Sequence, residues 1–174
     1  VFTGRGGPVQ LALYPLDSSY LQTAVVQGQK SPMLGWIPSD QKAIPTVRFR
    51  KVQRAPADFA TLLYPYKNER PIVSAIQLST SNVMAWAKRI ETDRETMELG
   101  LARGKNGLVF EMDSKLIGPV SIAASGLLIR KITEGGSTYI GAWNLSKIEN
   151  KEFSMSLETP SDLVFKQIGK RFIV

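Results

Sequence analysis

The sequence contains no cysteine and no histidine. Without cysteine, the chain has no disulfide bond, no thiolate nucleophile and no cysteine-based metal site. Without histidine, it lacks the usual general base at neutral pH, the most common metal ligand and any Ser-His-Asp triad. From these absences we expect no metal and no cofactor.

We expect neither a membrane helix nor a signal peptide in this sequence. No apolar run reaches the roughly 18 residues of a membrane helix, so we expect no membrane partner. The stretch from Val1 to Gly7 shows neither the basic start nor the apolar core of a signal peptide. It also lacks an initiator methionine, and we expect a processed chain or a piece of a longer protein. The lack of cysteine is compatible with a bacterial protein that is periplasmic or secreted, which is the location we expect.

The charge of the chain is strongly positive. Its 174 residues suffice for a sizeable core, and they carry a formal net charge of +7. Such an excess favours polyanionic partners, whether nucleic acid, acidic lipid or acidic polysaccharide. The basic residues are scattered and form no RNP-like or Lys/Arg-rich motif, so we expect no nucleic-acid partner.

Most of the chain has the pattern of short β-strands between turns. Thr46–Arg50 alternates strictly, whereas 59–64 is apolar on both faces and predicts a central strand. Asn106-Gly107, Gly118-Pro119 and the glycines at 135 and 136 mark turns, and Gly126 suggests a bulge. We predict an all-β fold, a β-sandwich of antiparallel sheets. The predicted strands are 21–26, 46–50, 59–64, 72–78, 108–112, 121–133, 138–145, 153–157 and 163–174.

Residues 82–101 fit two structures. Val83, Trp86, Ile90 and Met97 lie on a helical stripe, yet the same segment alternates on either side of a turn at 92–94. We favour a hairpin, because the segments on both sides have the pattern of strands.

The first 45 residues differ from the rest. Glycine and proline crowd residues 1–20, and three prolines interrupt residues 27–45. We therefore divide the chain into a loop-rich lead-in at 1–45, with one strand and packed on a partner domain, and a β-sandwich domain at 46–174. The lead-in should open before the strands of 58–80 in hydrogen exchange.

Several side chains suggest chemistry, but a structural role is the simpler interpretation. Acidic residues at 91, 93, 95 and 98 lack the spacing of a calcium loop and predict a solvated hairpin. A tyrosine base needs a lowered pKa, and tyrosines at strand ends usually pack their rings.

Trp86 and Trp143 lie inside predicted strands, where we expect them to be core. Trp36 lies in the long loop, where a ligand or another domain is within reach.

One region resembles a known family. Gln27-Gly28-Gln29, Pro32 and Gly35-Trp36, followed by a loop ending at Pro45 and by Leu63-Tyr64-Pro65-Tyr66, resemble the C-terminal β-sandwich region of heparinase II/III-like polysaccharide lyases. The resemblance covers residues 21–71 well and the remainder loosely.

The resemblance implies a parent enzyme that cleaves uronic-acid polysaccharides, including glycosaminoglycans, by β-elimination. Its bases, typically Tyr and His, belong to upstream regions, and no tyrosine here matches a catalytic motif. The chain is therefore expected to be the non-catalytic β-region of such a lyase, with acidic polysaccharide and an upstream catalytic domain of the same polypeptide as partners. The alternative is a stand-alone carbohydrate-binding β-sandwich. No residue is assigned as catalytic, and the polysaccharide-binding candidates are Trp36, Arg48, Arg50, Tyr66, Lys67 and Arg70.

Overall fold

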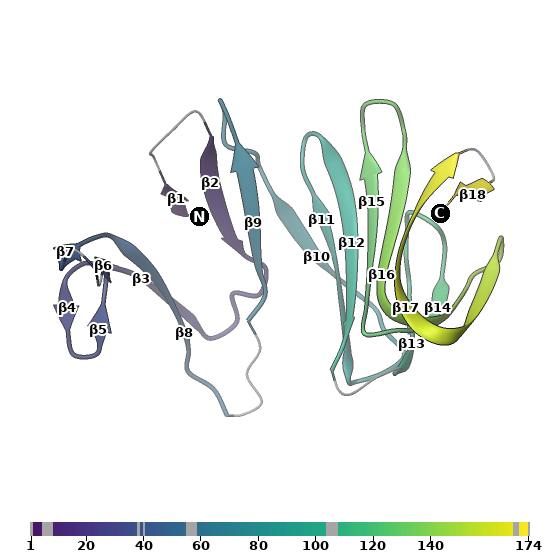
Figure 1. The fold of residues 1–174 in the computed structure, drawn as a ribbon, viewed down its shortest axis with the longest axis horizontal. Helices are drawn as coiled ribbons and strands as arrows, with labels where there is room; N and C mark the ends of the chain where they lie inside the picture. Colours follow the sequence, from purple (N-terminus) through teal and green to yellow (C-terminus); the bar gives the residue numbers. More distant parts are fainter. Residues whose placement is uncertain are drawn as a thin grey trace. The chain divides into compact units, whose positions relative to one another are not determined.

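The computed structural model describes residues 2–4, 9–37, 39, 41–54, 59–103, 108–168 and 171–173 (Figure 1). All regular elements among these residues are β-strands, and every strand pair is antiparallel. The predicted all-β class is therefore confirmed. The described part of the chain contains no helix of the length and apolarity that a membrane crossing requires.

The strands fall into two compact units, residues 1–70 and residues 71–174. Those of the first unit are β1 (Phe2–Gly4), β2 (Gln10–Pro15), β3 (Leu21–Val26), β4 (Gln29–Lys30), β5 (Met33–Leu34), β6 (Trp36–Ile37), β7 (Lys42–Ala43), β8 (Thr46–Lys51) and β9 (Thr61–Tyr66). Those of the second unit are β10 (Ser74–Leu78), β11 (Ala85–Glu91), β12 (Glu95–Ala102), β13 (Val109–Met112), β14 (Val120–Ala123), β15 (Gly126–Ile132), β16 (Thr138–Glu149), β17 (Ser154–Ile168) and β18 (Arg171–Ile173).

This division differs from the boundary at residue 45 that the sequence suggested. Strands β8 and β9 follow residue 45, but β8 pairs with β3 and β9 pairs with β2. The backbone hydrogen bonds of β8 and β9 therefore join them to the preceding residues.

The first unit consists of a three-stranded sheet, β1-β2-β9, a two-stranded ribbon of β3 and β8, and two short hairpins, β4–β5 and β6–β7. The expectation of an irregular lead-in is wrong for β2, where Ala12, Tyr14 and the following Leu16 are buried at every second position. Proline is tolerated here because Pro15 ends the strand. The prediction of a central strand at 59–64 is also wrong, because β9 is at the edge of its sheet and leaves Leu63 58% exposed.

An ion pair connects two of these sheets. Lys51 Nζ, at the end of β8, lies 2.6 Å from Asp17 Oδ2, just after β2. The hydrogen bond from Lys51 lowers the pKa of Asp17 to about 2. The pair therefore fixes the β3–β8 ribbon against the β1-β2-β9 sheet within the first unit.

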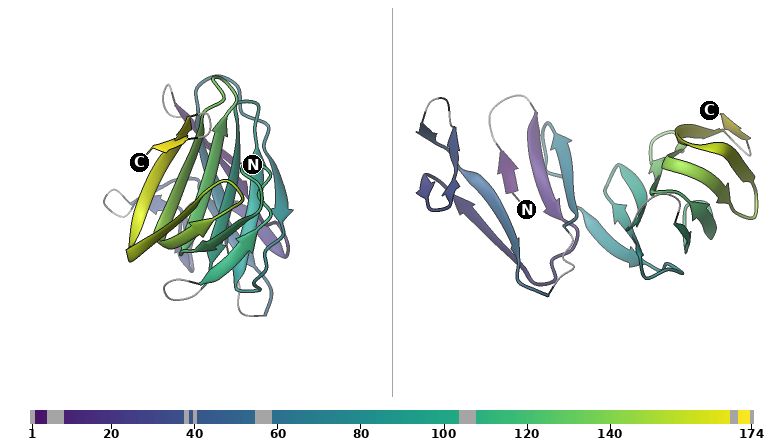
Figure 2. Two further views of the ribbon diagram at one scale, coloured as in Figure 1. Left: turned by 90° about the vertical axis from the view of Figure 1, so that its right-hand side faces the viewer. Right: turned by 60° about the horizontal axis from the view of Figure 1, so that its bottom comes forward.

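The second unit is one nine-stranded sheet in which the order β10-β11-β12-β15-β16-β14-β13 is extended by β17 and β18 on the other edge of β16. A bridge between Thr80 and Met112 joins β13 to the segment after β10, so the sheet curls nearly closed (Figure 2). Register shifts between Ala142 and Lys147 bend the long strands. The prediction of a β-sandwich, with two sheets packed face to face, is not confirmed. Strand pairing is continuous through all nine strands of this unit.

The concave face of this sheet holds the core. Its fully buried side chains include Phe110, Leu127, Ile129, Ile140 and Ile148. Alternation along each strand sends the neighbouring side chains to the opposite, outer face. That outer face carries the groove described below.

The hairpin predicted at 82–101 is confirmed. Strands β11 and β12 pair from Ala85↔Ala102 to Glu91↔Thr96 around a turn at 92–94. The predicted strand at 121–133 is interrupted at Ala124–Ser125, which separates β14 from β15. The turn predicted at Asn106-Gly107 lies outside the described residues.

Candidate functional site

A groove of about 480 Å³ lies on the outer face of the second unit, over β15, β16 and β17. Most of its lining is apolar, and charged side chains stand at its ends. The lining residues are Leu128, Arg130, Ile132, Tyr139, Gly141, Ala142, Trp143, Asp162, Leu163 and Val164.

The alternation of β16 creates the hollow of this groove. Tyr139, Gly141 and Trp143 share the outer face, while Ile140 and Ala142 between them are buried in the core. Gly141 has no side chain, and a Cβ placed there would meet only Val164 Cγ2, at 3.9 Å. Two aromatic residues thus flank an open position, with their Cα atoms about 13 Å apart at the rise of a strand.

The indole of Trp143 covers a second glycine. Gly126 lies directly opposite Trp143, and a Cβ at Gly126 would stand 2.7 Å from Cε3 of the indole and 3.0 Å from Leu101 Cδ2. The ring therefore lies over Gly126, yet Trp143 remains 42% exposed. The expectation that Trp143 is core is wrong, because its side chain lies on the outer face of the sheet, opposite the core residues Ile140 and Ala142. Trp86 is half-buried on the same outer face, opposite Leu101.

Two cations flank the other aromatic residue. Arg130 on β15 and Lys166 on β17 are the direct cross-strand neighbours of Tyr139. Arg130 Nε donates a hydrogen bond to Glu95 Oε2, and Lys166 Nζ stands 5.5 Å from the centroid of the Tyr139 ring. Among the described residues no carboxylate lies within 4 Å of the Lys166 ammonium.

The Trp143 end of the groove carries a negative charge instead. Asp162 lines the groove there, and its Oδ1 accepts a hydrogen bond of 2.8 Å from the backbone N–H of Asn144. The groove therefore has a cationic end at Tyr139, an apolar middle at Gly141 and an aromatic end at Trp143.

No family model, curated protein or solved structure matches this chain. The function must therefore be argued from the geometry of the groove and from the residues of the resemblance.

The binding candidates from the sequence all belong to the first unit, where four of them lie on three different sheets and two lie in a turn. Arg48 and Arg50 stand two residues apart on β8 and so share a face. Lys67 and Arg70 are exposed in the turn after β9. Tyr66 is buried, and its hydroxyl donates to Gln10 Oε1 at 2.8 Å.

Trp36, on β6, forms a hydrogen bond with the neighbouring β4–β5 hairpin. Its Nε1 donates a hydrogen bond of 2.9 Å to the carbonyl oxygen of Gln29, and its ring lies 3.4 Å from where a Cβ of Gly28 would be. The side chain is half-buried. Trp36 therefore helps to hold the segment between β3 and β8 together.

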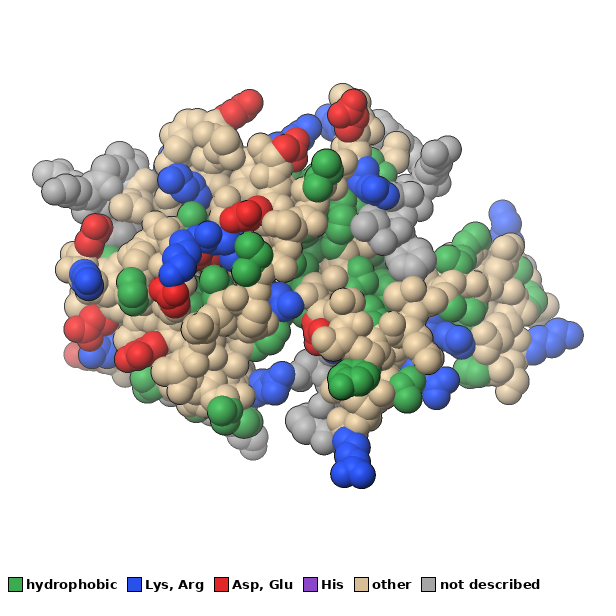
Figure 3. All heavy atoms as spheres, turned by 180° about the vertical axis from the view of Figure 1, so that it is seen from behind, with side chains coloured by type: hydrophobic (Ala, Val, Ile, Leu, Met, Phe, Trp, Pro, Cys, Tyr) green, Lys and Arg blue, Asp and Glu red, His purple; other side chains and the backbone are tan. Residues whose placement is uncertain are grey.

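The positive charge of the chain is concentrated in the first unit. Residues 1–70 contain nine Lys and Arg against four Asp and Glu, a net +5 of the total +7. On the face seen in Figure 3, basic side chains predominate on the first unit, whereas basic and acidic side chains are interspersed on the second. The first unit therefore supplies most of the long-range attraction for a polyanion.

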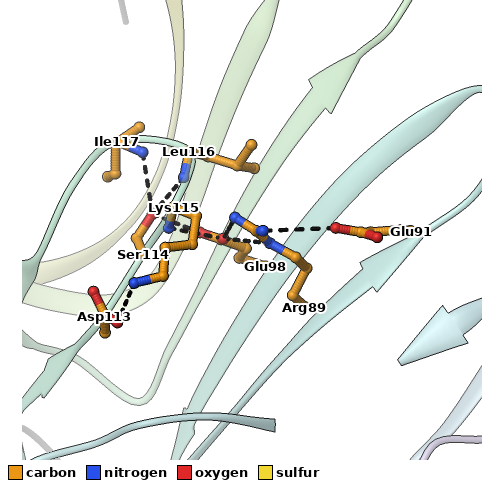
Figure 4. Close-up of polar contacts among 8 residues, drawn as sticks. All are labelled: Arg89, Glu91, Glu98, Asp113, Ser114, Lys115, Leu116 and Ile117. Atoms are coloured by element: carbon orange, nitrogen blue, oxygen red, sulfur yellow. Dashed lines mark hydrogen bonds and ion pairs between the residues drawn. The ribbon is translucent and has the colours of Figure 1, made fainter. Parts of the chain in front are cut away.

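A buried carboxylate in the second unit is a structural clamp. Glu98 is fully buried, and its Oε1 accepts hydrogen bonds from Arg89 Nε and Nη2 and from the backbone N–H of Lys115 (Figure 4). Its Oε2 accepts a hydrogen bond from the Ser114 hydroxyl. Both carboxylate oxygens therefore have hydrogen-bond partners, and these bonds connect the 113–117 loop to β11 and β12.

The sequence suggested that the acidic residues of this hairpin are solvated. Two of them are instead buried. Glu95 is 6% exposed and Glu98 is 0% exposed, and each is paired with an arginine on a neighbouring strand. Their side chains point to opposite faces of β12. Within the described part of the chain, no cluster of three or more acidic residues could hold a metal ion.

The sequence contained a signal for the groove that strand prediction overlooked. Tyr139-Ile-Gly-Ala-Trp143 places an aromatic, a glycine and a second aromatic at every second position of one strand. A glycine in that register opens a gap between the two rings. The cross-strand partners Gly126, Arg130 and Lys166 were not predictable, since their positions depend on the pairing of β15 and β17 with β16.

Proposed function

We propose that this chain is a non-catalytic β-region that binds glycans through the groove at Gly141. The observation that carries this proposal is the exposed indole of Trp143 beside an open, apolar hollow. A solvent-exposed aromatic face matches the apolar C–H face of a pyranose ring, and the flanking polar groups match its hydroxyls. Because the groove is open along β16, an extended saccharide chain fits it better than a compact ligand.

Two buried tyrosines of the first unit, Tyr14 and Tyr66, do not have the features of a catalytic base. Burial raises the pKa of Tyr14, although the charge of Arg70 opposes this shift. A raised pKa keeps the Tyr14 hydroxyl protonated at neutral pH, so little of the basic phenolate form is present there. The hydroxyl of Tyr66 is engaged with Gln10, and the chain contains no histidine.

A second candidate is the β-region of a heparinase II/III-like polysaccharide lyase. The residues that carry this resemblance have architectural roles in the first unit. Gly35 has φ +72° and its carbonyl accepts hydrogen bonds from Gly28 N and Ile44 N. A Cβ at Gly35 would stand 2.7 to 2.9 Å from three backbone groups. The path of the chain at position 35 therefore requires glycine, which gives this part of the motif a structural role in the first unit.

Calorimetric titration with alginate, heparin and neutral oligosaccharides tests glycan binding. The intact chain should bind at least one of them, and Trp143→Ala should weaken binding about tenfold, as loss of a central aromatic contact does. Gly141→Val should weaken it similarly, because its side chain fills the hollow. No ultraviolet absorbance from unsaturated sugar ends should appear in these mixtures.

The double variant Arg48→Ala/Arg50→Ala is the control in the first unit. It should reduce only the salt-sensitive part of the affinity, which fades as the Debye length falls from about 10 Å at 0.1 M to about 3 Å at 1 M salt. Loss of all binding in this variant, with Trp143→Ala unchanged, would place the site in the first unit. An intact chain that binds none of the glycans would disprove the function.

A further inference from the structure

The charges around the groove are arranged unevenly along β16. Tyr139 lies between two cationic side chains, Arg130 and Lys166, in one cross-strand row. Two residues further along, the row of Leu128, Gly141 and Val164 carries no charge. Direct cross-strand neighbours are about 5 Å apart at Cβ, so both cations reach a group lying over Tyr139.

The two cations differ in how far they are neutralised. Arg130 forms an ion pair with Glu95, whose side chain is only 8% exposed. The carboxylate of Glu95 offsets the positive charge of Arg130. Lys166 has no acidic partner within 4 Å in the described part of the chain, and its ammonium lies 5.5 Å from the centroid of the Tyr139 ring. Lys166 borders the groove beside Tyr139, which lines it, and is the cation at this end that no described carboxylate neutralises.

The opposite end disfavours an anion. Asp162 lines the groove near Trp143 and repels negative charge, although the N–H of Asn144 offsets part of that charge. An acidic group is thus favoured at the Tyr139 end and disfavoured at the Trp143 end.

We infer that the groove binds an acidic saccharide in one orientation, with an anionic group held by Lys166 beside Tyr139 and a neutral sugar face stacked on Trp143. This inference rests on the proposed glycan-binding function and specifies its ligand class. The anionic group is a carboxylate or a sulfate, since an ammonium ion attracts either as a point charge.

The test compares three probes of similar length at 0.1 M salt: alginate oligomers, which carry only carboxylates, dextran sulfate oligomers, which carry only sulfates, and neutral dextran oligomers. Lys166→Gln should weaken binding of an acidic probe about two- to fivefold, the usual range for one exposed ion pair. Binding of the neutral probe should not change. Lys166→Arg keeps the charge and should retain the affinity.

Lys131→Gln is the matched control. Lys131 is exposed on β15, directly beside Arg130 in sequence but on the other face of the strand, and its loss changes the net charge equally. If Lys131→Gln weakens acidic binding as much as Lys166→Gln, the attraction is diffuse and the inference fails. It also fails if Lys166→Gln weakens the neutral probe to the same extent.

The probes also separate this inference from the proposed function. Tight binding of neutral dextran that depends on Trp143, with no preference for either acidic probe, would support the glycan site and overturn its acidic specificity. Absence of binding to every probe would overturn both. A preference for alginate over dextran sulfate identifies the carboxylate, and the reverse identifies the sulfate.

Discussion

Two glycines on neighbouring strands shape the groove in opposite ways. Gly126 is buried because the Trp143 indole lies over it, whereas Gly141 is open to the groove. Neither glycine has a positive φ, so a side chain causes no backbone strain at either position. The effect of a substitution on stability therefore depends on the atoms that the new side chain would contact. The same residue type thus supports an aromatic ring at one position and leaves space for a ligand at the other.

Gly126→Ala and Gly141→Ala form a matched pair. The methyl group at 126 meets the indole at 2.7 Å and must displace it, so we expect a loss of about 1–3 kcal/mol in the free energy of unfolding and weaker glycan binding. The methyl group at 141 meets nothing closer than 3.9 Å, so Gly141→Ala should raise stability by about 0.5–1 kcal/mol. Urea unfolding followed by tryptophan fluorescence measures both, and equal effects would contradict the described position of the ring.

Individual strands were predictable where apolar and polar residues alternate without interruption by glycine or proline. The segment at 21–26 and the hairpin between β11 and β12 followed from alternation and from their neighbours. Strand β2 was missed because glycine and proline around it obscured the alternation of residues 11–16. The burial of Glu98 was missed for another reason: its partners Arg89 and Ser114 are brought to it by strand pairing and by the 113–117 loop.

The clamp at Glu98 predicts a large difference between two carboxylates of one hairpin. Glu98→Gln leaves Arg89, whose side chain is 18% exposed, without its buried counter-charge, and should cost about 3 kcal/mol of stability. Glu91 also contacts Arg89, at 3.6 Å, but its side chain is 42% exposed. Glu91→Gln should therefore cost less than about 1 kcal/mol. Denaturant midpoints for the two variants give the comparison, and similar losses would show that the clamp adds little.

At the scale of the whole molecule, the two units differ in how much apolar surface they bury. Among the described residues, the first unit has four buried apolar side chains, at Ala12, Tyr14, Leu16 and Tyr66, in sheets of two or three strands. The second unit has sixteen, inside a nine-stranded sheet. Small sheets with little buried apolar area are marginally stable, so the first unit, which carries most of the net positive charge, should be the less stable of the two.

Native-state hydrogen exchange should therefore resolve two opening reactions. The amides of β2 and β9 pair with one another from Gln10↔Tyr66 to Pro15↔Thr61, so they should exchange together, and faster than those of β12, β15 and β16. This outcome differs from the sequence-based expectation, in which residues 1–45 open while 58–80 stay closed, because β2 and β9 share hydrogen bonds. Mass spectrometry of peptides from each strand measures the rates. Exchange in β2 with β9 still protected would favour the boundary near residue 45, and equal protection of both units would show that they unfold as one cooperative body.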